Sequence, residues 1–380
     1  MPVIPYRIEI PQAAIDDLRA RLAATRWPDT VDGAGWDYGT NLEYMRSLVA
    51  HWHTGYDWYA TQNRLNELNH VSVEIDGLGV HAVHERGKGD NPIPLLILHG
   101  WPSSFFQMLP LIPLLTDPAA HGGDPADAFD VVVASLPGFG FSDRPTEPGM
   151  SVAAMAPLMI RVMAELGYER FGMRGSDLGA GVTGSIAATR PDVVIGHHTG
   201  GTNPWVRQVP DDLTDAEREF VQKAQAYGQS EMAYAWLQAS KPQTLSYGLN
   251  DSPAGLAAWI VEKFQRWGDT GGDVESRFDR DDLLTNITIY WVTETIGSSV
   301  RLYYETLRAM ATDGGDRGKP DVPTAMLIPR KDLFPTPREW VERTSRVDRW
   351  TETDTGGHFI EQEEPQLVAD DLRAFFRDLR

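Results

Sequence analysis

The sequence predicts an α/β fold in which a mostly parallel sheet is flanked by helices. One observation is a series of short, unbroken apolar runs, which are typical of strands buried on both faces: Leu95–Leu98, Val131–Ala134, Val193–Ile195 and Ala325–Ile328. A second is that helical stretches, such as Ala153–Leu166 and Leu367–Leu379, lie between and after these runs. This alternation favours a layered sheet covered by helices.

Residues 1–70 are predicted to be a helical N-terminal extension packed on the core. Apolar residues recur there at helical spacing, at Ile15, Leu18 and Leu22. The segment also carries four tryptophans, Trp27, Trp36, Trp52 and Trp58. So much aromatic surface favours packing over exposure to water. A β-hairpin is expected next, because apolar and polar residues alternate both before and after the turn Asp76-Gly77.

Residues 206–315 have a pattern that is nearly all helical, which predicts a helical lid inserted between two strands. Within this segment, Ser252 and Pro253 supply a helix cap and a first helical residue before an apolar run. The α/β core is therefore expected to comprise residues 71–205 and 316–380.

Composition narrows the classes of partner. The 54 acidic and 34 basic residues give a formal net charge of −20, which repels phosphate backbones and anionic membrane surfaces. We therefore expect no nucleic acid and no membrane as partner, while a homodimer is compatible with the sequence. The absence of cysteine excludes thiolate nucleophiles and Cys-ligated metals. The first residues show neither a signal-peptide pattern nor a membrane helix, so a soluble, cytoplasmic protein is expected.

The motif Gly175-Ser176-Asp177-Leu178-Gly179 lies between a strand-like stretch and a helix. A nucleophile elbow has this form, because the residues two before and two after the strained central position must be very small. Centred on Ser176, the flanking residues would be Arg174 and Leu178, which are too bulky. The spacing therefore selects Asp177 as the nucleophile, although a turn of this kind taken alone can also serve packing or phosphate binding.

A late histidine and a preceding acid complete a predicted triad of the α/β-hydrolase fold, whose order along the chain is nucleophile, acid, base. His358 follows a strand-like segment, so its loop should reach the carboxyl edge of the sheet. Asp332 follows the strand Ala325–Ile328 and is the preferred orienting acid. The other acids considered lie on the histidine's own strand and loop or on the wrong side of the acid loop: Glu352, Asp354, Asp321 and Glu339.

Backbone N–H donors for an oxyanion are expected from two places. His99-Gly100-Trp101 follows an early core strand, where such a loop belongs. The N–H groups of Trp101 and Leu178 are the expected pair. No cofactor or metal is predicted, because the paired histidines lack a third ligand at suitable spacing; they are His51 and His53, and His81 and His84.

Longer motifs surround these residues. In the predicted core they are His99–Ser104, Leu136–Ser142 and Gly175–Gly179, and in the predicted lid Tyr234–Gln238, Lys241–Leu245, Asn250–Pro253 and Ser298–Glu305. In these motifs the chain resembles the microsomal-type epoxide hydrolases, over nearly its whole length. The segment Pro5–Trp27 is similar to the N-terminal region of that family, and we expect it to lack the membrane anchor of the animal members.

The resemblance implies that Tyr234 and Tyr303 are paired acids that open an epoxide ring, with Asp177 forming a covalent aspartyl ester and water then releasing a vicinal diol. Tyr304 is the alternative to Tyr303, since adjacent positions on a helix point about 100° apart and only one can face the nucleophile. One departure is Leu178, where many relatives carry tryptophan, so the pocket wall there should be smaller.

Two other functions are compatible with the same fold and the same three triad candidates. A haloalkane or haloacid dehalogenase uses the same Asp-His-Asp triad but needs N–H donors for halide, and Leu178 stands where such a donor often lies. A non-catalytic ligand-binding protein is the second alternative, because a fold does not determine function. Retention of all three triad candidates and two tyrosines favours an epoxide and water as the small-molecule substrates.

Overall fold

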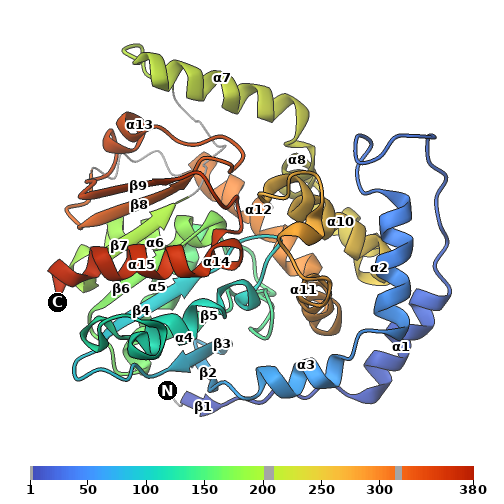
Figure 1. Cartoon of the computed structure of the whole chain (residues 1–380), viewed down its shortest axis with the longest axis horizontal. Coiled ribbons are helices and arrows are strands. Elements are labelled where there is room, and N and C mark those ends of the chain that lie inside the picture. The colour runs from blue at the N-terminus through green and yellow to red at the C-terminus, as the bar shows by residue number, and fades with distance from the viewer. Residues whose placement is uncertain (1–2, 201–208, 313–318) are drawn as a thin grey trace.

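A computed structural model describes residues 3–200, 209–312 and 319–380 of the chain (Figure 1). Both predicted boundaries of the lid, at 205/206 and 315/316, lie outside the described residues. Within the described ranges, no helix combines the length and the apolar character that crossing a membrane requires.

The described part of the chain forms one nine-stranded sheet in the order β1-β2-β3-β5-β4-β6-β7-β8-β9. The pairings from β1 to β5 along this order are antiparallel, and those from β5 to β9 are parallel. The prediction of a mostly parallel sheet is therefore confirmed. The strands are β1 (Val3–Pro5), β2 (His70–Ile75), β3 (Leu78–Glu85), β4 (Ile93–Leu98), β5 (Phe129–Ala134), β6 (Phe171–Gly175), β7 (Val194–Gly200), β8 (Thr324–Pro329) and β9 (Arg349–Thr353).

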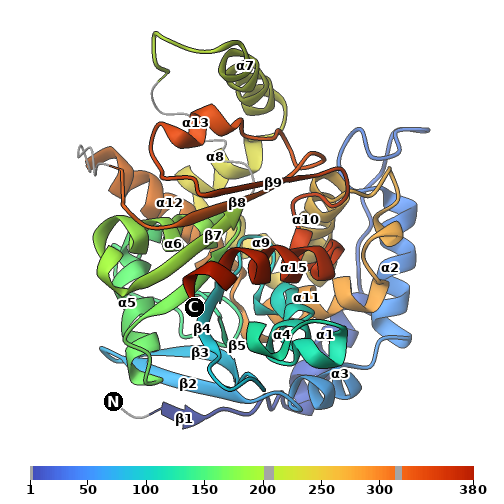
Figure 2. The same ribbon diagram turned by 60° about the vertical axis from the view of Figure 1, so that its left-hand side comes forward.

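Helices cover both faces of this sheet, as Figure 2 shows. One face carries α5 (Val152–Glu165) and α6 (Asp177–Thr189), and the other carries α4 (Leu111–Thr116) and α15 (Pro365–Phe376). The central strands β4, β5 and β8 are buried along their length, apart from Pro94. Burial on both faces explains why these strands read as unbroken apolar runs.

Between β7 and β8 the described chain is mainly helical. The helices are α7 (Asp215–Ser230), α8 (Ala233–Ser240), α9 (Pro242–Asp251), α10 (Pro253–Trp267), α11 (Arg280–Thr293) and α12 (Ile296–Thr312). The start of α10 has the predicted cap, because Ser252 Oγ accepts the Gly255 N–H at 3.0 Å. Two short helices, α13 (Arg338–Glu342) and α14 (Ile360–Glu363), follow β8 and β9.

The N-terminal segment packs along these helices through α1 (Gln12–Ala23), α2 (Leu42–Thr54) and α3 (Trp58–Leu65), on the right of Figure 1. Trp52 Nε1 donates to Thr288 Oγ1 at 3.0 Å, so one of its tryptophans is anchored in α11. The segment is not wholly helical, because β1 pairs with β2 at the edge of the sheet. A three-residue strand is too short to show alternation, and Pro5 at its end is tolerated only at such an edge.

Candidate active site

Four loops meet where parallel strands of the sheet end. Gly100 and Trp101 follow β4, Asp177 follows β6, Asp332 follows β8 and His358 follows β9. Parallel strands present their carboxyl ends at the same edge, so residues far apart in the chain come together there. This edge is therefore the candidate active site.

Asp177 sits in the strained turn that its glycine neighbours predict. It has a φ of 49°, a left-handed conformation that is uncommon for any residue except glycine. A Cβ on Gly175 would lie 2.5 Å from the Gly179 carbonyl oxygen, and one on Gly179 would lie 2.3 Å from the Leu98 carbonyl oxygen. Neither position can hold a larger residue without displacing the backbone that aims Asp177.

The imidazole of His358 lies between two carboxylates. Its Nδ1 is 3.0 Å from Asp332 Oδ1, and its Nε2 is 3.5 Å from Asp177 Oδ2. Burial lowers the pKa of His358, but the charges of Asp332 and Asp177 outweigh that effect and raise the pKa well above its usual value. The resting site therefore favours an imidazolium between the two carboxyl groups.

The other oxygen of Asp177 accepts a backbone hydrogen bond. The Trp101 N–H donates to Asp177 Oδ1 at 2.8 Å. Gly100 lets the loop approach this closely, because a Cβ there would lie 2.3 Å from the same oxygen. Leu178 is in the first turn of α6, where N–H groups have no partner within the helix. Of the two expected oxyanion donors, the Trp101 N–H thus contacts the Asp177 carboxylate, and Leu178 follows Asp177 directly in the chain.

The two tyrosines expected to face the nucleophile both line its cavity. Tyr234 of α8 and Tyr303 of α12 have ring centroids 6.2 Å apart. Burial and the nearby negative charge of Asp177 raise the pKa of both phenols well above 10.0, so both are held in the protonated form. Tyr304 is not among the described residues that line the cavity, and its hydroxyl accepts a hydrogen bond from Arg308 at 2.8 Å.

The cavity that these residues share has a volume of about 350 Å³. Asp177, Tyr234 and Tyr303 supply polar groups to its wall, and several threonines add hydroxyls. Much of the rest is apolar, including Leu178, Phe220, Leu307, Met310, Met326 and Trp340. Few polar groups aimed into a mainly apolar cavity are characteristic of a small-molecule site.

Trp267 is a neighbour of the site that the sequence did not single out. Its ring centroid is 5.2 Å from that of His358 and 5.2 Å from that of Tyr234. Its carbonyl oxygen also accepts the His358 N–H at 2.9 Å. The sequence shows Trp267 only as the last apolar residue of a helix, so no local signal pointed to this contact.

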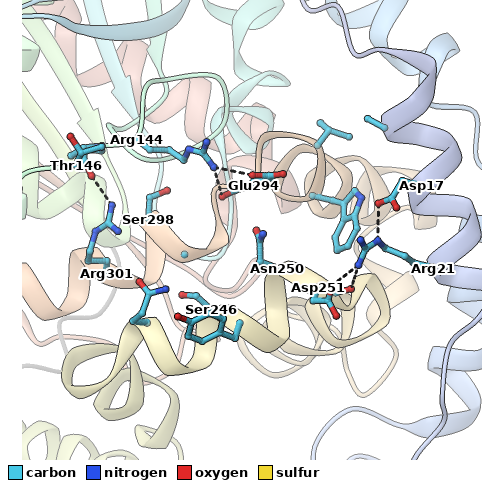
Figure 3. Close-up of a pocket in the computed structure, with 17 residues that line it drawn as sticks. Asp17, Arg21, Arg144, Thr146, Ser246, Asn250, Asp251, Glu294, Ser298 and Arg301 are labelled. Atoms are coloured by element: carbon cyan, nitrogen blue, oxygen red, sulfur yellow. Dashed lines mark hydrogen bonds and ion pairs between the residues drawn. The ribbon is translucent and has the colours of Figure 1, made fainter.

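A larger cavity, of about 1060 Å³, opens between α1, α9 and α12 but contains none of the predicted site residues (Figure 3). Its three arginines already have partners: Arg21 contacts Asp17 and Asp251, Arg144 contacts Glu294, and Arg301 donates to the Pro145 carbonyl. In the described part of the chain, no group of three or more His, Asp or Glu side chains is placed to hold a metal ion.

Comparison with known proteins identifies the family. Residues 3–108 match the family described as "Epoxide hydrolase N terminus", and residues 93–271 match "alpha/beta hydrolase fold". A putative epoxide hydrolase of Stigmatella aurantiaca (strain DW4/3-1) is 43% identical, over 100% of this chain and 86% of that protein. Epoxide hydrolase 1 of Oryctolagus cuniculus is 33% identical, over 98% of this chain and 88% of its own length.

Solved structures agree over the whole chain. Juvenile hormone epoxide hydrolase of the silkworm Bombyx mori is 29% identical with a TM-score of 0.85, covering 100% of this chain and 94% of that one. The Aspergillus niger epoxide hydrolase is 26% identical with a TM-score of 0.87, covering 100% and 97%. The predicted α/β-hydrolase fold and the resemblance seen in the sequence motifs are therefore confirmed. The chain belongs to the epoxide hydrolase family of enzymes, within the α/β-hydrolase superfamily.

Proposed function

We propose that the protein converts an epoxide to a vicinal diol through a covalent ester on Asp177. The observation that carries this proposal is a strained carboxylate and two protonated phenols that line one cavity, with an imidazole 3.5 Å from the carboxylate. A carboxylate can form an ester, phenols can donate a proton to oxygen, and an imidazole beside the ester can activate water.

In the first step, Asp177 Oδ2 attacks a ring carbon and the strained C–O bond breaks. We assign the attack to Oδ2 because Oδ1 accepts the Trp101 N–H, whereas Oδ2 faces the His358 imidazole at 3.5 Å. The epoxide oxygen takes a proton from Tyr234 or Tyr303, while the second phenol donates a hydrogen bond to it. This avoids an isolated alkoxide in a poorly hydrated cavity. The product is a hydroxyalkyl ester of Asp177, and the proton that the His358 imidazolium then releases replaces the one lost from the phenol.

In the second step, His358 deprotonates a water molecule that attacks the ester carbonyl carbon. Formation of the ester removes the charge of Asp177, one of the two charges that raise the pKa of His358. The imidazole can then lose its proton and act as a base. Asp332 holds Nδ1, and the Trp101 and Leu178 N–H groups stabilise the oxyanion on Oδ1. As the tetrahedral intermediate breaks down, the imidazolium of His358 protonates the departing diol oxygen, and the proton left on the Asp177 carboxyl group then passes to the imidazole, which restores the resting state.

The substrate that fits this cavity is an apolar epoxide. The wall is largely aliphatic and aromatic, and its charged group is the nucleophile itself. We also propose that residues 206–315 act as a lid, since Phe220, Tyr234 and Tyr303 enter the cavity from helices of that segment. Water is the second substrate, and the proposed steps use neither cofactor nor metal.

The dehalogenase alternative is less well supported. Halide release needs N–H donors in the cavity, and the candidate is the indole of Trp101. The described lining of the cavity does not include Trp101, whose ring lies flat against Tyr234 at a centroid distance of 5.4 Å. The hydroxyls of Tyr234 and Tyr303 instead favour an oxygen leaving group.

Oxygen labelling in a single turnover tests the covalent mechanism. With excess enzyme in heavy-oxygen water, the label should enter the Asp177 carboxylate, because water attacks the ester carbonyl. The diol from that first turnover should carry oxygen from the enzyme. Peptide mapping locates the label. Label found directly in the diol, with none on residue 177, would rule out the ester.

The two phenols should be needed for ring opening. Replacing Tyr234 or Tyr303 with phenylalanine removes one donor from the developing alkoxide, and each should slow ester formation by about 10²-fold. The double variant, Tyr234→Phe with Tyr303→Phe, should lose most of the ester-forming activity that remains in each single variant. Rapid quenching followed by intact-mass measurement gives the rate of this step.

Tyr304→Phe is the matched control, because Tyr304 lies next in sequence but contacts Arg308. It should change ester formation by less than about twofold. A strong defect in this variant together with full activity of Tyr303→Phe would reverse the assignment.

A further inference from the structure

The loop that carries His358 is attached to the C-terminal end of α10. The His358 N–H donates to the Trp267 carbonyl at 2.9 Å. This carbonyl belongs to the last turn of a helix, where it has no partner within the helix. A Cβ on Gly357 would lie 2.6 Å from both the Trp267 oxygen and the Asp269 nitrogen. The base loop and the loop after α10 therefore touch backbone to backbone.

The buried carboxylate of Glu363 holds this junction together. Glu363 is the last residue of α14 and is 8% exposed. Its Oε2 accepts the N–H groups of Gly357 at 3.0 Å and Asp269 at 2.7 Å, and its Oε1 accepts that of Phe359 at 3.0 Å. The residues immediately before and after His358 are thus both bonded to one carboxylate, which also reaches the loop after α10.

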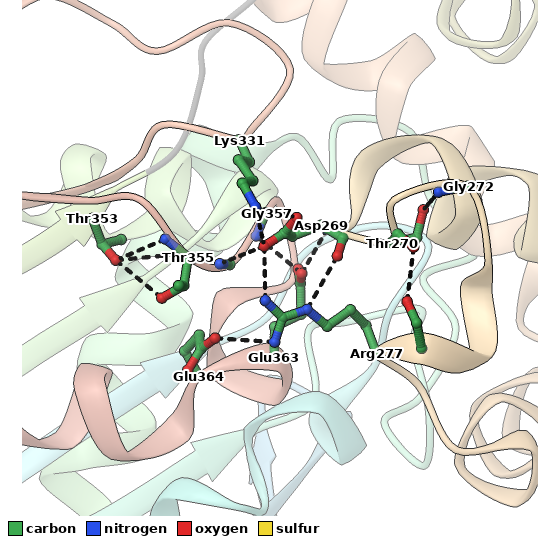
Figure 4. A network of polar contacts seen from close by, with 12 residues as sticks. Asp269, Thr270, Gly272, Arg277, Lys331, Thr353, Thr355, Gly357, Glu363 and Glu364 are labelled. Atoms are coloured by element: carbon green, nitrogen blue, oxygen red, sulfur yellow. Dashed lines mark hydrogen bonds and ion pairs between the residues drawn. The ribbon is translucent and has the colours of Figure 1, made fainter.

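A second carboxylate, Asp269, extends the network to the acid loop (Figure 4). Lys331, which precedes Asp332, lies 2.9 Å from Asp269, and Arg277 lies 2.7 Å from it. Asp269 also accepts the Gly356 N–H at 3.3 Å. Burial raises the pKa of Asp269, but the ion pairs with Lys331 and Arg277 outweigh that effect and lower it. The loops of the base and the acid are therefore tied to the same point after α10.

Glu363 lies outside the candidate cavity. The described lining of the cavity contains neither Glu363 nor Asp269. Phe359 adds packing to the same junction, since its ring stacks on Phe264 of α10 at a centroid distance of 4.1 Å. Ionised, Glu363 is an acceptor only, which suits three converging N–H donors.

We propose that Glu363 is a positioning residue for His358. By holding the N–H groups on both sides of the base and that of Asp269, it sets the direction of the imidazole toward Asp177 and ties that direction to α10. This inference rests on the proposed covalent mechanism and concerns its second step. Attack by Asp177 on the epoxide needs no proton transfer by His358, whereas ester hydrolysis does. Glu363 should therefore matter for hydrolysis and much less for ester formation.

The Glu363→Gln variant tests this separation. Glutamine has nearly the same shape, but its amide nitrogen cannot accept an N–H, so at least one of the three hydrogen bonds is lost. A misplacement of about 1 Å at a reacting group can cost about 10²-fold in rate. We expect ester hydrolysis to slow by about 10- to 100-fold while ester formation changes by less than about threefold. The ester should then accumulate during steady-state turnover, as a covalent adduct in quenched intact-mass spectra.

Glu364→Gln is the matched control, because the neighbouring carboxylate pairs with Arg277 and accepts no N–H from the base loop. Both steps should stay within about twofold of the wild-type rates. If Glu363→Gln does not fold, Glu363→Asp keeps the charge but is too short to reach all three donors, and it should also slow hydrolysis selectively.

Equal slowing of both steps, or no slowing of hydrolysis in a folded Glu363 variant, would overturn the positioning role. The His358→Gln variant, measured in parallel, separates this failure from a failure of the mechanism. Adduct in His358→Gln without a hydrolysis defect in Glu363→Gln would reject only the role of Glu363. Absence of adduct in His358→Gln would reject the covalent mechanism itself.

Discussion

Replacing Asp177 with asparagine is expected to reduce diol formation by at least about 10⁴-fold, because the amide cannot attack the epoxide carbon. Asparagine is the appropriate substitute, since it tolerates a positive φ better than most residues. Its amide oxygen can also keep the hydrogen bond from Trp101. The circular dichroism spectrum and melting temperature should therefore stay close to those of the wild type. Diol formation is followed by chromatography, and intact mass verifies that the amide persists.

The control for this variant is Asp354→Asn, which removes a carboxylate that is 84% exposed and pairs with Arg330 on the surface. Its activity should remain within about twofold of the wild type. Substantial turnover by Asp177→Asn, with the amide intact, would remove Asp177 as the nucleophile and with it the proposed mechanism.

Replacing His358 with glutamine is expected to lower steady-state diol formation by about 10³-fold. Unlike Asp177→Asn, this variant should accumulate the covalent ester. Asp177 is still present, so an epoxide should still be opened. Without the base, the ester should persist. An intact-mass spectrum after mixing with an apolar epoxide should show the protein plus one epoxide, and digestion should place the adduct on Asp177.

His121→Gln is a suitable comparison, because His121 is exposed and ends a short 3₁₀ helix, Pro118–His121, that precedes β5. It should turn over normally and show no adduct. The double variant Asp177→Asn with His358→Gln should show no adduct either. An adduct on another residue in His358→Gln would contradict the assignment of the nucleophile.

Much of the fold could be predicted because hydrophobic burial is visible in the sequence. Strands covered on both faces must be apolar throughout, and β4, β5 and β8 are accordingly visible as runs in the chain. The edge strand β1 was missed, since three residues at the end of a sheet are under no such constraint.

The candidate nucleophile could be predicted because its constraint is local and steric. Only residues without a Cβ fit at Gly175 and Gly179, so the spacing of two glycines selects the residue between them. Family resemblance supplied Tyr234 and the choice of Tyr303 over Tyr304. Nothing local in the sequence separates those two tyrosines, and it is the packing of α12 that turns one toward the cavity.

By itself, the sequence determined the class of fold and the strained position of Asp177. These depend on which residues can be buried and which can fit a tight turn, and both are properties of short segments. Only the tertiary structure decided that Trp267 borders His358 and that Glu363 bonds the residues on both sides of it. The first contact joins segments that are distant in the chain, and the second needs donor and acceptor atoms placed within about 3 Å of each other across a turn. No periodicity or spacing encodes that information.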